Sequence, residues 1–142
     1  LILLIGILKK NAEILLNYAE ALNEAEGPTA EVYNAVNKIR RRAQLLDLPA
    51  NLTKDEMRNK IRQERRVELA FENHRFWDVR RWKIAEIVDN KKVHKITVNA
   101  DGTYSYPVFQ NRVFDKAKHY LFPIPQSEID KNRNLVQNPG WN

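Results

Sequence analysis

Two glutamates on one expected helix have the clearest catalytic potential in the chain. Glu64 and Glu68 are four residues apart, so a helix places both carboxylates on one side. Paired carboxylates are the acid and base of glycoside hydrolysis, and their separation sets the mechanism. They can equally join Arg65, Arg75 or Arg80 in a partly buried ion network, which perturbs carboxylates without catalysis. No nearby motif supplies a positioned water or a substrate cleft, so we expect the network and no enzyme activity.

Large aromatic residues stand among arginines just after this pair. Guanidinium groups and rings can stack on bases or sugar faces. They can also form a wedge between two helices, with rings buried and arginine stems over their edges. Trp77 and Trp82 are five residues apart and cannot point the same way on one helix, which disfavours a flat binding platform. We therefore expect one structural cluster of ions and rings. Its predicted members are Glu64, Arg65, Glu68, Phe71, Arg75, Phe76, Trp77, Asp78, Arg80 and Trp82.

Other catalytic and metal-binding patterns are missing from the sequence. The three histidines, His74, His94 and His119, have no close ligand spacing, and the chain contains no cysteine. With only 4 glycines there is no glycine-rich phosphate loop, and no serine sits in a Gly-x-Ser-x-Gly frame. We predict no catalytic residue, no cofactor and no metal site. The sequence does not identify ligand-contact residues.

The net charge of +6 raises the question of nucleic acid. Positive residues alternate with Glu and Asp along the helical stretches, which favours a solvated basic surface over a binding patch. The run from Arg40 to Arg42 ends its expected helix, where the helix dipole favours cations. A basic helical nucleic-acid binder that uses this run and residues 62–66, or a helical module for protein partners, stays as the alternative function.

A pair of antiparallel helices is the first element that the pattern predicts. Apolar residues recur at helical spacing over residues 11–25, and Gly27 and Pro28 stop that helix. Thr29 can begin a second helix after this short turn, so the two should pack against each other. The unit 12–45 has the length of a tetratricopeptide-type helix pair, about 34 residues.

The rest of the chain is predicted to be helical first and extended later. Thr53 and Glu56 make a capping box that opens a helix running to about Glu72, and Asn73 suits its end. A further helical segment covers 74–87. Beyond Asn90, alternating apolar residues around Asp101-Gly102 predict a small β-hairpin, and prolines keep 121–125 extended. The expected fold is mainly α, with a tetratricopeptide-like helix pair, further helices and a small hairpin and extended C-terminal region.

The first ten residues do not fit these elements. Leu1 to Leu8 form an apolar run that is far shorter than the roughly 20 residues needed to cross a bilayer. Lys9 and Lys10 follow the run, whereas a signal peptide carries its positive charges in front. We leave residues 1–10 as an unassigned apolar leader and expect the chain to begin inside a longer protein.

Three segments together resemble the SusD/RagB family. They are AEILLNYAEA from Ala12 to Ala21, IRQERRVELAFENHRFWDVRRW from Ile61 to Trp82, and YLFPIPQSEIDKNRNLVQNPGW from Tyr120 to Trp141. Found in this order, they identify residues 11–142 as a SusD/RagB-like C-terminal domain. The family commonly has an arginine before the Ala-Glu pair, whereas Lys9 and Lys10 precede it here.

The resemblance implies a binding protein and not an enzyme. Members are lipoproteins of polysaccharide utilisation and nutrient uptake, anchored on the extracellular face of the outer membrane. They bind oligosaccharides, or in some branches peptides, and cover a TonB-dependent transporter of the SusC type. We therefore expect non-catalytic carbohydrate or peptide capture with that transporter as partner, and no nucleic acid. The lipid anchor and most ligand contacts would lie in an N-terminal part absent from this sequence.

Overall fold

The computed structural model describes residues 2–141, with side chains from Asn11 onward, so the side chains of the unassigned leader 1–10 lie outside the described residues. The described part contains six helices and four short strands and is 47% helical, which confirms the mainly α prediction. No helix within it has the length and apolar character required to cross a membrane. The chain divides into two compact units, residues 1–75 and 76–142.

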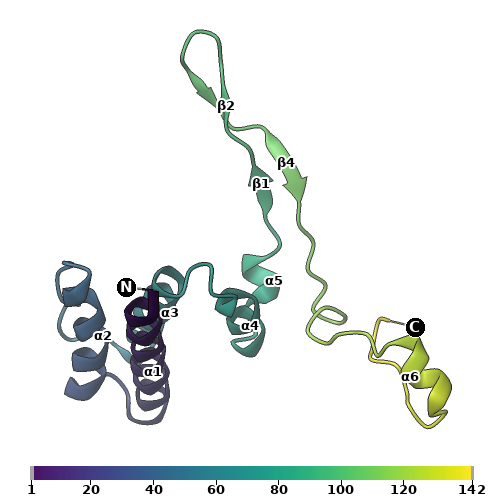
Figure 1. Cartoon of the computed structure of the whole chain (residues 1–142), viewed down its shortest axis with the longest axis horizontal. Helices are drawn as coiled ribbons and strands as arrows, with labels where there is room; N and C mark the ends of the chain where they lie inside the picture. The colour runs from purple at the N-terminus through teal and green to yellow at the C-terminus, as the bar shows by residue number, and fades with distance from the viewer. Residues whose placement is uncertain (1, 142) are drawn as a thin grey trace. The chain divides into compact units, whose positions relative to one another are not determined.

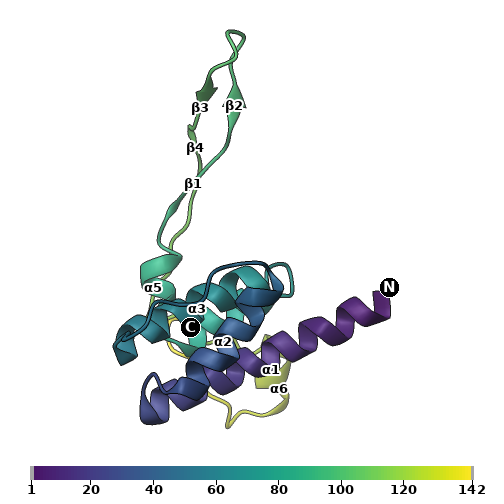
Figure 2. The same ribbon diagram turned by 90° about the vertical axis from the view of Figure 1, so that its left-hand side faces the viewer.

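Three helices make up the first unit (Figures 1 and 2). They are α1 (Ile2–Glu26), α2 (Ala30–Arg42) and α3 (Lys54–Glu68), and both α2 and α3 pack against α1. The predicted helix pair is confirmed, although α1 begins at Ile2 and not near Asn11. Gly27 allows the sharp reversal after α1 because its φ of 90° suits a residue without a side chain.

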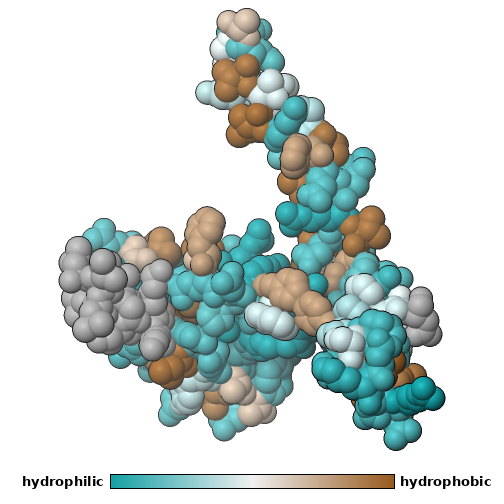
Figure 3. Space-filling model, turned by 45° about the vertical axis from the view of Figure 1, so that its right-hand side comes forward, coloured by the Kyte–Doolittle hydropathy of each residue, from teal (hydrophilic) through white to brown (hydrophobic). Residues whose placement is uncertain are grey.

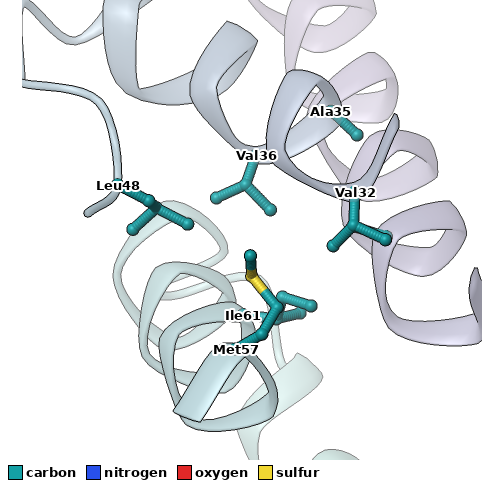
Figure 4. Close-up of a cluster of buried hydrophobic side chains, with 7 residues drawn as sticks. Val32, Ala35, Val36, Leu48, Met57 and Ile61 are labelled. Carbon is teal, nitrogen blue, oxygen red and sulfur yellow. The ribbon is translucent and has the colours of Figure 1, made fainter. Parts of the chain in front are cut away.

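Apolar side chains from all three helices form the core of this unit. Val32 and Val36 of α2 face Met57 and Ile61 of α3, and all four are fully buried (Figure 4). Leu16 of α1 lies in a second buried cluster beside them. Because each helix places apolar residues three or four apart, one stripe of every helix is buried and the other sides stay solvated.

Buried polar side chains fix the loop between α2 and α3. The backbone N–H of Leu48 donates to Asn37 Oδ1 at 2.9 Å, and the N–H of Leu52 donates to the Tyr33 hydroxyl at 2.9 Å. Asn23 of α1 donates its side-chain N–H to the carbonyl of Lys54 at 3.1 Å. The first two bonds satisfy loop N–H groups that would otherwise lack partners, and the third joins α1 to the first residue of α3.

The start of α3 is as predicted and its end is not. Thr53 and Glu56 form the expected capping box. The helix ends at Glu68, four residues before the predicted Glu72, because the chain then enters a turn with two left-handed residues, Phe71 at φ 65° and Asn73 at φ 64°. Asn73, which was predicted to end the helix, instead lies in this turn.

The predicted segment 74–87 is divided into two short helices. They are α4 (His74–Arg81) and α5 (Ala85–Val88), and Lys83 separates them with a φ of 53°. A left-handed residue cannot continue an α-helix, so the break is local. Val79, Ala85 and Phe114 form the small buried core of the second unit.

The predicted hairpin is present as a two-stranded ribbon with an irregularity. Strands β1 (Lys92–His94) and β4 (Val108–Asn111) pair antiparallel, with a shift in register between Val93 and His94. Nearer the tip, β2 (Thr97–Val98) pairs with β3 (Tyr104–Ser105). Such a shift is a β-bulge, which increases the local twist.

The remaining chain, 112–141, holds α6 (Gln126–Lys131) and otherwise lacks regular structure. The indole N–H of Trp141 donates to the carbonyls of Lys118 at 3.2 Å and Leu121 at 3.1 Å. Gly140 has a φ of 78°, and a Cβ there would lie 2.9 Å from the Lys118 Cβ. This segment is therefore held by side-chain hydrogen bonds and by the close approach of Gly140 to Lys118, and not by a sheet or a helix.

The α2–α3 core gives a direct test of the fold. We expect Ile61→Ala to lower the free energy of unfolding by about 2–5 kcal/mol, since it leaves a cavity in a fully buried site. Urea unfolding followed by far-UV circular dichroism measures the loss. Ile14→Ala removes the same atoms from an exposed position of α1 and should change stability by about 0.5 kcal/mol or less. Equal effects of the two substitutions would contradict this packing.

Candidate functional site

The two glutamates that could do chemistry are paired with arginines of α2. Arg40 Nη1 donates to Glu64 Oε2 at 2.7 Å, and their side chains are 22% and 11% exposed. Arg42 forms an ion pair with Glu68. These carboxylates therefore pair with the run Arg40 to Arg42, which was expected only to end its helix, whereas Arg65, Arg75 or Arg80 were the expected partners.

The same network reaches α1. Arg65 is 5% exposed, and its Nη1 donates to Asn17 Oδ1 at 2.6 Å. Buried charges need such partners because removal from water is costly. A pocket of about 180 Å³ between α1 and α2 is lined by Leu15, Lys38 and Ile39 among others, and neither Glu64 nor Glu68 lines it. The arrangement can hold three helices together, and it presents no carboxylate pair to a substrate.

The aromatic residues behave differently from the buried wedge that was predicted. Phe71 is 105% exposed, and Phe76 and Trp77 are 42% and 58% exposed. Phe71 lies in the turn after α3, where its φ is 65°. These three rings are therefore exposed in the described chain, whereas an interior position was expected.

The ten residues predicted as one cluster fall into the two units. Those in residues 1–75 are Glu64, Arg65, Glu68, Phe71 and Arg75, and those in residues 76–142 are Phe76, Trp77, Asp78, Arg80 and Trp82. In the second unit, Arg81 Nε donates to the buried Asp78 at 3.0 Å and its guanidinium lies 4.8 Å from the Trp82 ring.

The rings of Phe76, Trp77 and Phe122 form an exposed aromatic surface beside α4. The Trp77 ring lies 5.0 Å from the Phe76 ring and 5.9 Å from Phe122, which follows the ribbon in sequence. The ring centres of Phe76 and Phe122 are 5.9 Å apart, so the three rings touch one another. The sequence did not indicate Phe122 as a member, because its approach depends on the path of the irregular segment.

A pocket of about 310 Å³ adjoins these rings. Its lining includes Phe76, Arg80, His119, Phe122 and Trp141. The Arg80 guanidinium carbon lies 3.5 Å from the centre of the Phe76 ring, and Arg80 Nη1 donates to the Phe76 carbonyl at 3.0 Å. Burial lowers the pKa of Arg80, which the Asp89 carboxylate partly opposes. Arg80 Nε is buried without a hydrogen-bond partner among the described residues. The lining of the pocket combines mainly apolar and aromatic side chains with this one arginine.

The histidines lie in three separate environments. His74 Nε2 is 3.7 Å from Glu13 Oε2, His94 Nδ1 donates to the Tyr106 carbonyl at 2.7 Å, and His119 Nδ1 accepts from the Asp115 N–H at 2.8 Å. Among the described residues, no three histidine or acidic side chains gather closely enough to hold a metal ion.

Comparison with known proteins identifies the family. The model of the SusD family matches residues 11–141, nearly the whole chain. The chain belongs to the SusD family. It is 37% identical to SusD-like protein P2 of Formosa agariphila in an alignment of 138 positions that covers 92% of this chain and 25% of that protein.

Solved SusD-like structures have the same fold. A SusD-like protein from Bacteroides fragilis superposes with a TM-score of 0.81 at 38% identity, over 91% of this chain and 24% of that one. A SusD homolog from Bacteroides thetaiotaomicron gives a TM-score of 0.68 at 34% identity, over 92% and 26% of the two chains. This chain therefore spans about a quarter of the length of the relatives that it matches.

Membership of the SusD family gives the general role. The family binds nutrients and is known for binding and not for catalysis. SusD proteins generally work with TonB-dependent transporters, and the family suggests a surface-exposed lipoprotein of the outer membrane. The neutralised carboxylates of α3 agree with a scaffold in a protein of this kind.

The Arg40–Glu64 pair should be essential for stability. We expect Glu64→Gln to lower the free energy of unfolding by about 3 kcal/mol, because it leaves a half-buried guanidinium without its counter-charge. Asp47→Asn is the matched control, since the Arg41–Asp47 pair is exposed and should matter far less. Thermal and urea unfolding compare the two. A fully stable Glu64→Gln protein would show that the pair is not structural.

The ion pair between Glu24 of α1 and Arg58 of α3 should make the stability of the fold depend on pH in the acid range. Arg58 Nη2 donates to Glu24 Oε2 at 2.7 Å, and this bond holds the pKa of Glu24 below its ordinary value of 4.5. The folded carboxyl has the lower pKa, so the pair stabilises the fold above about pH 4.5 and the contribution is lost as the pH falls through the folded value.

We expect Arg58→Met to raise the pKa of Glu24 toward 4.5, as measured by NMR titration of the side-chain carboxyl carbon. Arg66→Met removes an exposed arginine from the same helix and should leave the titration unchanged. A pKa that is insensitive to Arg58 would exclude the contact.

Proposed function

We propose that this chain is part of a non-catalytic capture protein that binds oligosaccharides, or peptides, on the extracellular face of the outer membrane. The captured ligand passes to a TonB-dependent transporter of the SusC type, and a lipid anchor holds the protein at the surface. The observation that carries the proposal is the match to the SusD family over residues 11–141, with a TM-score of 0.81 to a solved member.

The electrostatics of α3 support binding without hydrolysis. A retaining or inverting glycosidase needs one protonated and one ionised carboxyl group that face the sugar across a cleft. Here Glu64 is paired with Arg40, and Glu68 is paired with Arg42. Both carboxylates are therefore engaged by guanidinium groups, and neither lines the pocket between α1 and α2.

The aromatic surface of the second unit supports an affinity for sugars or aromatic peptide side chains. Ring faces stack on the C–H groups of sugars and on other rings, and a guanidinium donates to hydroxyl or carbonyl oxygens. Trp77 and Phe122 expose more than half of their surface, and Arg80 lines the adjoining pocket.

The arrangement of the arginines argues against nucleic acid. Arg40, Arg41 and Arg42 form ion pairs with Glu64, Asp47 and Glu68, respectively. Arg65 is buried. A phosphate backbone would have to compete with these carboxylates, and the run offers no free cationic stripe for it.

Binding by the product of the complete reading frame tests the proposal. We expect at least one oligosaccharide from a glycan array to bind measurably in isothermal titration calorimetry, and to be recovered uncleaved after prolonged incubation. Trp77→Ala with Phe122→Ala tests whether the aromatic surface takes part, and Val136→Ala is an exposed apolar control.

Several outcomes would contradict the proposal. Cleavage of the bound sugar would make the protein an enzyme, and affinity for RNA that falls steeply with salt would favour the nucleic-acid alternative. Absence of both glycan and peptide binding would remove the capture role. The reading frame should also encode a signal peptide ending in a lipidated cysteine, and a TonB-dependent transporter should be encoded beside it.

A further inference from the structure

The β-ribbon of residues 91–112 is the most exposed element of the second unit. It leaves α5 and returns to Phe114 with backbone pairing only between its own strands among the described residues, so both outer edges are open (Figures 1 and 2). Two-stranded ribbons in water are marginally stable without a supporting surface. Free edges also present unpaired N–H and C=O groups to any strand that approaches.

Large apolar side chains lie along this ribbon. Those that are exposed to water are Ile96, Val98, Tyr104, Tyr106, Val108 and Phe109. Figure 3 shows hydrophobic and hydrophilic residues alternating along its length. Single exposed apolar residues are normal on protein surfaces, but six large ones on one short ribbon indicate a binding surface.

The ribbon is also strongly cationic. Lys91, Lys92, Lys95 and Arg112 are all exposed, against one carboxylate at Asp101. Within the described chain none of these four cations forms a salt bridge, and Asp101 accepts hydrogen bonds from Thr103. In the first unit, by contrast, the arginines of α2 all have carboxylate partners. The ribbon therefore has positive charge available for a partner.

The charge pattern limits what that partner is. A second copy of the ribbon would bring four cations against four others, which opposes edge-to-edge pairing. Insertion of the tip into an anionic bilayer is opposed by its polar residues, among them Asn99 and Asp101. A protein face with carboxylates around an apolar centre matches both features of the ribbon.

We propose that the ribbon of residues 91–112 docks on an acidic face of a protein partner, and that this partner is the TonB-dependent transporter of the proposed function, on which the inference rests. The lysines steer and orient the encounter, while Tyr104, Tyr106 and Phe109 supply the buried apolar contact. A free strand edge allows backbone pairing with the partner as well.

The experiment uses the product of the complete reading frame and the purified transporter encoded beside it. Biolayer interferometry measures their affinity for the wild type, for Lys91→Glu/Lys92→Glu/Lys95→Glu, and for Tyr104→Ser/Tyr106→Ser/Phe109→Ser. The matched charge control is Lys38→Glu/Lys60→Glu/Lys131→Glu, which reverses exposed lysines elsewhere. Circular dichroism and glycan binding confirm that each variant is folded.

Both ribbon variants should bind the transporter about tenfold more weakly or worse, whereas the control changes by about twofold or less. Added salt should weaken the wild type more than the charge-reversed variant. Hydrogen exchange in residues 91–112 should be fast in the free protein and slow in the complex.

Other results would overturn the inference. Ribbon variants that bind as well as the wild type, or a control that loses as much, would show that this surface is not used. Slow exchange before the transporter is added would mean that the protein's own chain covers the ribbon, and a stable dimer lost in the variants would make a second copy the occupant. Preferential binding of the wild type to vesicles with anionic lipid, in place of the transporter, would assign the ribbon to a membrane. A wild type that binds glycan but not the transporter removes the partner from the proposed function and this inference with it.

Discussion

Neutralisation of the α3 carboxylates by the α2 arginines is the constraint on which the helical unit depends. Glu64 is nearly buried and would be costly there without Arg40. Arg42 pairs with Glu68, which lies one helical turn after Glu64 on α3. Two ion pairs therefore fix how α3 lies on α2. Arg65 extends the contact to α1 through Asn17. The apolar residues alone would permit sliding between the helices, whereas directed charge pairs specify one register.

The two units differ in how many of their side chains remain available for contacts outside the chain. The charged side chains of the first unit are largely used for internal pairing, which leaves little chemistry there for a ligand. The second unit has the opposite character, because Trp77 and Phe122 are exposed and Arg80 lines a pocket beside Phe122. A nutrient-binding protein needs a rigid part whose side chains pair internally and a surface whose side chains can contact a ligand. The division between them follows the division of the chain into two units.

Sequence reasoning succeeded where the causes are local. The capping box at Thr53 and the helix-breaking role of Gly27 involve residues within one turn of each other. It was less successful where distant residues meet. Arg40 lies 24 positions before Glu64, and no periodicity names that partner. Phe71 lies exposed in the turn after α3, and the bulge at Val93 depends on pairing across the ribbon. The three quoted segments identified the family correctly because they are specific in combination.

The last residues of the chain show how a segment without sheet or helix can still tolerate little change. Gly140 leaves no room for a side chain beside Lys118, and Trp141 holds two carbonyls through one indole N–H. The same tryptophan forms part of the pocket wall, 5.9 Å from His119. A bulky substitution at position 140 would push this wall outward and change the cavity without touching any residue inside it. Efforts to re-engineer the cavity should therefore leave the final turn intact and vary its other walls.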